Sequence, residues 1–188
     1  GDVRAFINLD AAGSRGRALL FQVGGGTGLA RAYQRSFPAP WAMVVAQDLF
    51  QSGLVGSDTD FRVYREHGLP GLDLAFYEDG YAYHTALDGP ERLEPGSLQH
   101  LGDGVLALVR ELARSGWAAD GSEDAPVVFH DVLGVGMVVL SRAQSLGLAV
   151  GATVFALAVL GLGLRRGVLQ GRELRRGVAR VLRMGAGG

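Results

Sequence analysis

The chain has 188 residues, of which 48% are hydrophobic and 20% are charged, so it can bury a core and is not disordered throughout. Its net charge of −1 excludes nucleic-acid binding driven by overall charge. The sequence contains no cysteine, which excludes disulfide bonds and cysteine-ligated zinc.

Strands alternate with helices along the first part of the chain. Apolar runs, helical spacing and glycine or proline breaks predict, in chain order, strand 4–10, strand 17–23, helix 28–36, strand 41–47, helix 57–68, strand 71–78 and helix 97–114. This alternation is typical of an α/β layer fold with a largely parallel sheet. In such sheets the chemistry gathers beyond the carboxyl ends of the strands, where we expect Asp10 and the loop that carries His84.

Helix 97–114 has the clearest pattern of these elements. Its leucines and valines recur at helical spacing, while charged and polar residues take the other side. Ser97 is the expected N-cap, and Gly116 follows the expected end.

The carboxyl-terminal third is different in composition. A polar segment, 116–126, precedes residues 127–140, which are apolar but too few to span a bilayer and are expected in a core or at an interface. Residues 145–164 then carry no charge, and their length predicts a transmembrane helix. A helix buried in a soluble core is the alternative.

Arginines dominate the chain after this apolar run. The positive-inside rule therefore predicts a cytosolic tail over 165–188 and a lumenal or external location for residues 1–140. The tail also suits anionic membrane lipid, although a stop-transfer flank explains it as well. Gly147 and Gly151 form a G-x-x-x-G spacing that favours a homodimer through the transmembrane helix, with chance spacing as the alternative.

Two polar side chains are candidate metal ligands. Asp10 follows a strand and His84 lies in a loop, and they supply the carboxylate and imidazole that zinc accepts. From spacing alone, a structural role for both is the more common alternative.

Several blocks of the sequence together resemble one known family. They read FINLDAAGSRGRALLFQVG, AQDLFQSGLVGSDTDFRVYREHG, PGLDLAFYEDGYAYHT and PGSLQHLGDGVLALVRELA, and the similarity covers about residues 3–115. In this order they are similar to the second half of the catalytic domain in metallopeptidase family twenty-eight. Within it, the nearest group is the endoplasmic reticulum metallopeptidases and vacuolar membrane proteases.

The resemblance implies a fold and a division of the chain. The fold is a three-layer α/β/α aminopeptidase-like (zinc peptidase) fold, incomplete here and followed by a transmembrane helix. The implied parts are the carboxyl-terminal part of the catalytic domain at 1–118, a linker and juxtamembrane segment at 119–144, the transmembrane helix at 145–164 and the arginine-rich tail at 165–188.

The resemblance also implies roles for four residues. Asp10 matches a terminal ligand of one zinc ion and His84 a terminal ligand of the other, with two zinc ions per complete catalytic domain. Tyr83 matches a tyrosine whose hydroxyl helps to hold the tetrahedral intermediate of peptide hydrolysis. Asp58 matches an acid that faces the substrate or orients a metal ligand.

Other parts of the family pattern do not occur in this sequence. The H-x-D-S block, the metal-bridging aspartate and the Glu-Glu pair of base and ligand would all precede the FINLD strand. We therefore expect an inactive fragment of a membrane-anchored zinc exopeptidase that acts on peptides in the endoplasmic reticulum or vacuole. The alternative is a noncatalytic membrane-anchored binding or scaffold module that keeps the peptidase-like fold.

Overall fold

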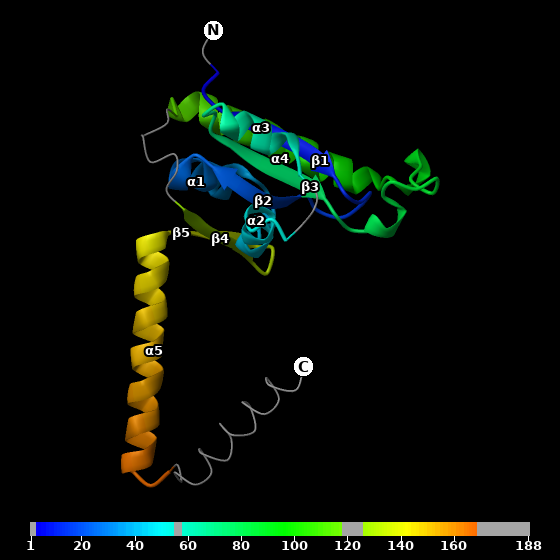
Figure 1. The fold of residues 1–188 in the computed structure, drawn as a ribbon. Coiled ribbons are helices and arrows are strands. Elements are labelled where there is room, and N and C mark those ends of the chain that lie inside the picture. The colour runs from blue at the N-terminus through cyan, green and yellow to red at the C-terminus, as the bar shows by residue number, and fades with distance from the viewer. Residues whose placement is uncertain (1–2, 55–57, 118–125, 169–188) are drawn as a thin grey trace. The chain divides into compact units, whose positions relative to one another are not determined.

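The computed structural model describes residues 3–54, 58–117 and 126–168 (Figure 1). The chain divides into two compact units, residues 1–142 and residues 143–188. The first unit mixes strands and helices, which confirms the expected α/β class, and the second contains most of one long helix.

The central sheet has three strands, β1 (Phe6–Ala11), β2 (Leu19–Gly24) and β3 (Gly71–Phe76), in the order β1-β3-β2. Strand β1 is parallel to β3 and β2 is antiparallel to it, so the sheet is mixed and the expectation of a largely parallel sheet is wrong. The connection between β1 and β2, residues 12–18, is shorter than the dozen or so residues of a parallel crossover. The carboxyl ends of the two parallel strands meet at one edge, where Asp10 lies.

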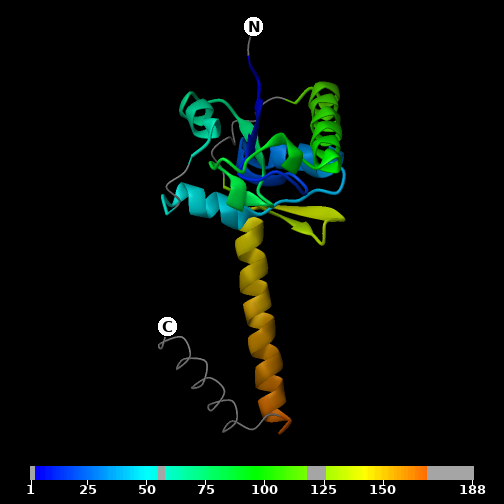
Figure 2. The same cartoon turned by 90° about the vertical axis from the view of Figure 1, so that its right-hand side faces the viewer.

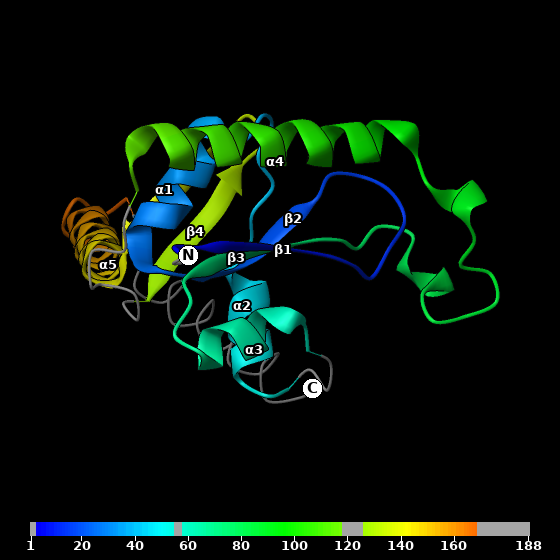
Figure 3. The same cartoon turned by 90° about the horizontal axis from the view of Figure 1, so that it is seen from above.

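Helices cover both faces of this sheet. Helices α1 (Gly26–Ser36) and α4 (Pro95–Ser115) lie on one side, and α2 (Val44–Gln51) and α3 (Asp60–Glu66) lie on the other (Figure 3). Figure 2 likewise shows α3 and α4 on opposite sides of β1. Both faces of the sheet are therefore partly shielded from solvent.

The main core lies between the sheet and helices α1 and α4. Alternate residues of β3, Leu72 and Leu74, point to this face, and they are fully buried with Leu20 of β2, Tyr33 of α1 and Leu108 of α4. The other residues of β3 point to the face covered by α2 and α3. That second face carries the polar groups described below.

Helix α2 replaces a strand that the sequence predicted at 41–47. Only Ala42 and Met43 make isolated β-bridges, and the chain becomes helical at Val44. Two contacts spaced by three positions favour the helix: the Gln47 side chain accepts the Val23 N–H at 2.8 Å, and Phe50 packs on an aromatic ring of β2. Tertiary contacts thus override the strand propensity of the two adjacent valines.

Helix α4 begins earlier than the sequence predicted. It starts at Pro95 with Glu94 as N-cap, and Ser97, the expected cap, is buried in the first turn. A proline at the first helical position costs nothing because its missing N–H would have no partner there. The predicted end is confirmed, since Gly116 follows the helix in the left-handed conformation.

A β-hairpin completes the first unit. Strands β4 (Val127–Val132) and β5 (Gly136–Ser141) pair antiparallel, and their alternate residues are buried in the main core. Gln34 of α1 donates to the carbonyl of Met137 at 2.6 Å. This part of the expected linker and juxtamembrane segment, 119–144, therefore belongs to the folded unit, while residues 118–125 lie outside the described residues.

Helix α5 (Arg142–Arg165) contains the predicted transmembrane segment. An 18-residue window of this helix has a mean hydropathy of 2.2, none of the helix is buried, and it is long and apolar enough to cross a membrane. At 1.5 Å per residue its length is about 36 Å, against a hydrocarbon core of about 30 Å. The structure does not describe most of the predicted tail, because its residues from 169 onward lie outside the described ranges.

Candidate functional site

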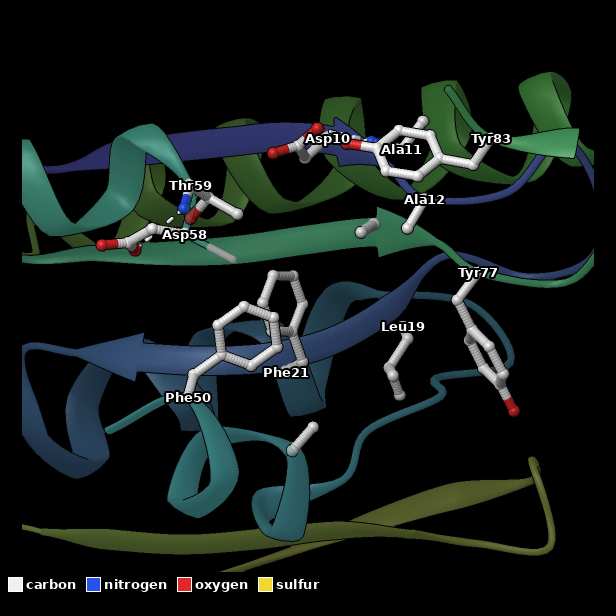
Figure 4. Close-up of a pocket in the computed structure, with 12 residues that line it drawn as sticks. Asp10, Ala11, Ala12, Leu19, Phe21, Phe50, Asp58, Thr59, Tyr77 and Tyr83 are labelled. Carbon is white, nitrogen blue, oxygen red and sulfur yellow. Dashed lines mark hydrogen bonds between the residues drawn. The ribbon is translucent and has the colours of Figure 1, made fainter. Parts of the chain in front are cut away.

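A pocket of about 160 Å³ opens at the carboxyl ends of β1 and β3, on the face covered by α2 and α3 (Figure 4). Its lining residues are Asp10, Ala11, Ala12, Leu19, Phe21, Ala46, Phe50, Asp58, Thr59, Ala75, Tyr77 and Tyr83. Figure 4 shows Leu19, Phe21 and Phe50 on one side, and Asp10, Thr59 and Tyr83 on the other. The pocket therefore has an apolar wall and a polar rim.

Asp10 lies on this rim at the end of β1. Its carboxylate is exposed, and one oxygen accepts the N–H of Ala11 at 2.7 Å. This bond holds the side chain near the strand end and leaves the other oxygen without a hydrogen bond among the described residues. The predicted location of Asp10 at the carboxyl end of a strand is confirmed.

Tyr83 and His84 lie in the loop after β3, between the short helices η1 (Gly80–Ala82) and η2 (Pro90–Arg92). Their rings stack with centroids 3.8 Å apart, and His84 has a left-handed backbone with φ 59°. Tyr83 lines the pocket, and its ring lies over the end of β1 with the hydroxyl directed toward Asp10 (Figure 4). His84 is exposed and is not part of the pocket lining.

The loop after β1 and the loop after β3 contact each other through their backbones. The Ala12 N–H donates to the carbonyl of Phe76 at 2.8 Å, and the Ser14 N–H donates to that of Glu78 at 3.0 Å. Gly13 permits this approach, because a Cβ there would overlap the Glu78 carbonyl. The contact places the loop that leads to Tyr83 beside the loop that follows Asp10.

A partly buried carboxylate, Asp79, joins the same two loops. It accepts hydrogen bonds from Ser14 at 3.2 Å, Arg15 at 3.0 Å and Arg92 at 2.8 Å, and we name these four residues the Asp79 cluster. Burial alone would raise the pKa of Asp79, but the bonds from Arg92 and Arg15 lower it overall. Arg92 also lies over the ring of Tyr81, 4.7 Å from its centroid. The cluster fixes the loop on both sides of His84.

Asp58 lies on the pocket rim just before α3. One carboxylate oxygen accepts the Thr59 N–H at 2.9 Å, and the other pairs with Arg62 of α3. The side chain is still 45% exposed, so it can also meet a ligand in the pocket. Its charge, however, is already shared with Arg62.

Below the rim, Asp73 is fully buried in the middle of β3. It accepts hydrogen bonds from Asn8 of β1 at 2.8 Å, Gln22 of β2 at 3.1 Å and Thr59 before α3. Burial raises the pKa of Asp73 to about 6. The three hydrogen bonds oppose this rise in pKa, whereas the negative charge of nearby Asp10 adds to it. The carboxylate thus ties three strands and α3 together.

Neither Asp73 nor Asp79 was predicted as a site residue from the sequence. The signal for Asp73 was an acidic residue inside the otherwise apolar run GLDLAF. Asp79 had no comparable signal, because its partners come from the loop after β1 and from η2.

The predicted metal ligands fit zinc by donor type but do not form a cluster. A carboxylate and an imidazole are both ordinary zinc ligands. Within the described ranges, no three histidine, cysteine, aspartate or glutamate side chains gather closely enough to hold a metal ion. Asp10 and His84 can therefore each supply a single ligand, and neither makes a site with other described residues.

The sequence matches a family of peptidases. Residues 1–109 match peptidase family M28, which is more than half of the chain. The chain belongs to peptidase family M28. The match covers the central sheet, the pocket and most of α4.

Relatives of this M28 chain carry peptidase names. It is 46% identical over 165 residues to "Endoplasmic reticulum metallopeptidase 1" of Mus musculus, covering 86% of this chain and 18% of the relative. It is 49% identical over 137 residues to the protein of the same name in Homo sapiens, covering 71% and 15%. It is 36% identical over 141 residues to "Vacuolar membrane protease" of Yarrowia lipolytica, covering 74% and 14%.

The M28 chain thus spans less than a fifth of the length of these relatives. No solved structure matches it.

Proposed function

We propose that this chain is the carboxyl-terminal part of the catalytic domain of a membrane-bound, zinc-dependent metalloexopeptidase. The parent domain would have the three-layer aminopeptidase-like fold and would hydrolyse peptides from the amino terminus. One observation carries the proposal: Asp10 at the end of β1 and Tyr83 in the loop after β3 line one pocket at the carboxyl ends of parallel strands. Membership of a peptidase family and metallopeptidase names among the relatives support it.

In this proposal each residue has one role. Asp10 and His84 are the terminal ligands of two different zinc ions, which activate a water molecule when bound. Tyr83 donates a hydrogen bond to the carbonyl oxygen of the substrate as negative charge develops on it. Asp58 attracts the positively charged amino terminus of the peptide, at the edge of the apolar wall.

The bridging aspartate and the glutamate base would come from a longer protein that includes this chain. The lack of a three-ligand cluster within the described ranges supports this division of the site. The 188 residues by themselves would then be inactive. The alternative function is that of a noncatalytic scaffold module, and the experiment below distinguishes it from a peptidase.

The membrane part of the proposal rests on α5 and on the relatives' names. We propose a location in the endoplasmic reticulum or vacuolar membrane, with residues 1–140 in the lumen and the tail in the cytosol. Membrane lipid would surround α5, and Gly147 and Gly151 would allow two copies to pair.

The test measures zinc content and peptide hydrolysis together. In the longer protein containing these residues, Asp10→Ala and His84→Ala should each lower bound zinc from two ions toward one and reduce hydrolysis at least about a hundredfold. Asp88→Ala and His67→Ala are matched controls, because both residues are exposed and lie outside the pocket lining. Full zinc content and activity in both Asp10 and His84 variants would refute the proposal.

A further inference from the structure

The hairpin of β4 and β5 has a second side that faces away from the main core. Along each strand alternate residues point into the core, and the residues between them point away from it. We name the second set the outer face, and it consists of Val128, His130, Val132, Gly136, Val138 and Leu140. All of these except His130 are apolar, and each is only partly buried or exposed. The outer face is therefore an apolar surface that the core does not cover.

The turn of the hairpin is more exposed still. Leu133 is 93% exposed and Val135 is 84% exposed. Leu133 and Gly134 are both left-handed, with φ 53° and 67°, and the Val135 N–H donates to the carbonyl of Val132 at 3.0 Å. Such a turn favours asparagine or aspartate followed by glycine, and a leucine in its first central position is strained. Folding of the hairpin thus gives no reason for an exposed leucine at this position.

The connection to α5 indicates which partner covers this side. Strand β5 ends at Ser141 and α5 begins at Arg142, so no linker separates the hairpin from a helix that is long and apolar enough to cross a membrane. A bilayer that contains α5 would begin within a few residues of Leu140, at one end of the outer face. At about 3.4 Å per residue, the six residues of β5 span only about 20 Å from that end to the turn. The whole outer face is therefore within reach of the same membrane surface.

The side chains beside the turn also suit a membrane surface. Arg17 donates to the carbonyls of Gly134 at 3.5 Å and Ala39 at 3.4 Å, and its guanidinium lies 5.7 Å from the centroid of the Trp41 ring. Tryptophan and the long side chain of arginine are both favoured at the level of lipid headgroups. The one acid of the hairpin, Asp131, lies on the core side of β4 and accepts the Gly134 N–H at 2.8 Å, so it does not oppose contact with lipid.

We propose that the outer face of the hairpin lies against the bilayer that contains α5, with Leu133 and Val135 inserted below the headgroups. This inference rests on the membrane part of the proposed function. The partner is lipid, because the apolar surface begins where the membrane helix begins. The first unit would then have two attachments to the membrane, α5 and the hairpin.

Spin labels on single cysteines measure this contact, because the chain has no cysteine of its own. The 188-residue chain would be placed in phosphatidylcholine nanodiscs with a nitroxide at Leu133→Cys or Val135→Cys. Both labels should lie about 5–10 Å below the headgroups, and a water-soluble nickel complex should collide with them at least about fivefold less often than with the control label, while oxygen collides freely. The matched control is Leu106→Cys, which is 48% exposed on α4, on the core side of the sheet.

A fourth label, at Phe155→Cys in α5, separates this inference from the proposal on which it rests. If that label is in lipid while those at 133 and 135 meet nickel as often as the control label, α5 spans the membrane and the inference is wrong. Low collision rates with both oxygen and nickel at 133 would mean that protein, such as a second copy, covers the turn, and would also overturn the inference. If the label at 155 meets nickel freely, α5 does not span and both statements about the membrane fail. None of these labels reports zinc or hydrolysis, so the peptidase proposal is decided by its own test.

The longer protein gives the same comparison if the 188-residue chain does not fold alone. A photoreactive benzoylphenylalanine at position 133, in phosphatidylcholine vesicles, should cross-link to lipid on irradiation, and the same group at position 106 should not. Lipid cross-links from position 133 alone support the inference. Equal lipid cross-linking from both positions, or none from position 133, overturns it.

Discussion

Replacing Asp73 by asparagine should remove a pH dependence from the stability of the first unit. In the folded chain the pKa of Asp73 is about 6, because burial disfavours its charged form. In the unfolded chain the same group has its ordinary value of 3.8. Between these values the folded state holds a proton that the unfolded state releases, so the free energy of unfolding falls as the pH rises from about 4 to 6.

The two pKa values set the size of this effect. At 1.36 kcal/mol for each pH unit, the difference between 3.8 and about 6 corresponds to roughly 3 kcal/mol. The contribution is fully present below pH 4, declines through the window and is gone above about pH 6.5. Asp79 has a lowered pKa and adds stability that is lost only as the pH falls through that lower value, so it does not mimic the trend.

Urea unfolding in detergent from pH 4 to 7.5 measures the effect, with the two tryptophans of the chain as fluorescent reporters. Both tryptophans, Trp41 and Trp117, lie in the first unit. The free energy of unfolding of the wild type minus that of Asp73→Asn should fall by about 3 kcal/mol across this range. The matched control is Asp88→Asn, which removes an exposed carboxylate and should give a difference in the free energy of unfolding that does not change with pH. A flat difference for Asp73→Asn as well would refute the argument from burial.

Two further substitutions test the packing. Gly13→Ala should destabilise the first unit by about 1–3 kcal/mol in urea, because its Cβ meets the Glu78 backbone, whereas Gly102→Ala in open space within α4 should be neutral or stabilising. Phe129→Ala should lower the free energy of unfolding by about 3–5 kcal/mol, because this hairpin side chain is fully buried in the core. Leu133→Ala, at the exposed tip of the hairpin, should change the free energy of unfolding little. Equal effects within either pair would contradict the structure.

The sequence predicted most elements whose pattern is local. Strands β1 and β3 and helices α1 and α4 have apolar periodicity and end signals within their own residues, and they form close to the predicted ranges. Asp10 at a strand end could be predicted for the same reason. The resemblance to the family supplied the roles that the periodicity could not.

The features that were predicted wrongly, or not predicted, depend on contacts between residues far apart in the sequence. The segment 41–47 has strand-forming valines, and only its contacts with β2 make it helical from Val44 onward. The direction of β2 follows from the short connection before it and not from its own residues. In the Asp79 cluster, Asp79 bonds to Ser14 and Arg15, which are 65 and 64 positions away in the sequence, so no local sequence pattern predicts the cluster.

The contact between the loops has a consequence for how the site responds to a ligand. The ordering entropy of the loop around Tyr83 and His84 is already lost on folding, since the Asp79 cluster and the Gly13 contact hold it against the loop after β1. A ligand that meets Asp10 and Tyr83 finds both groups in place and loses little further entropy in ordering them. Affinity at this pocket should therefore depend on loop contacts that no ligand touches.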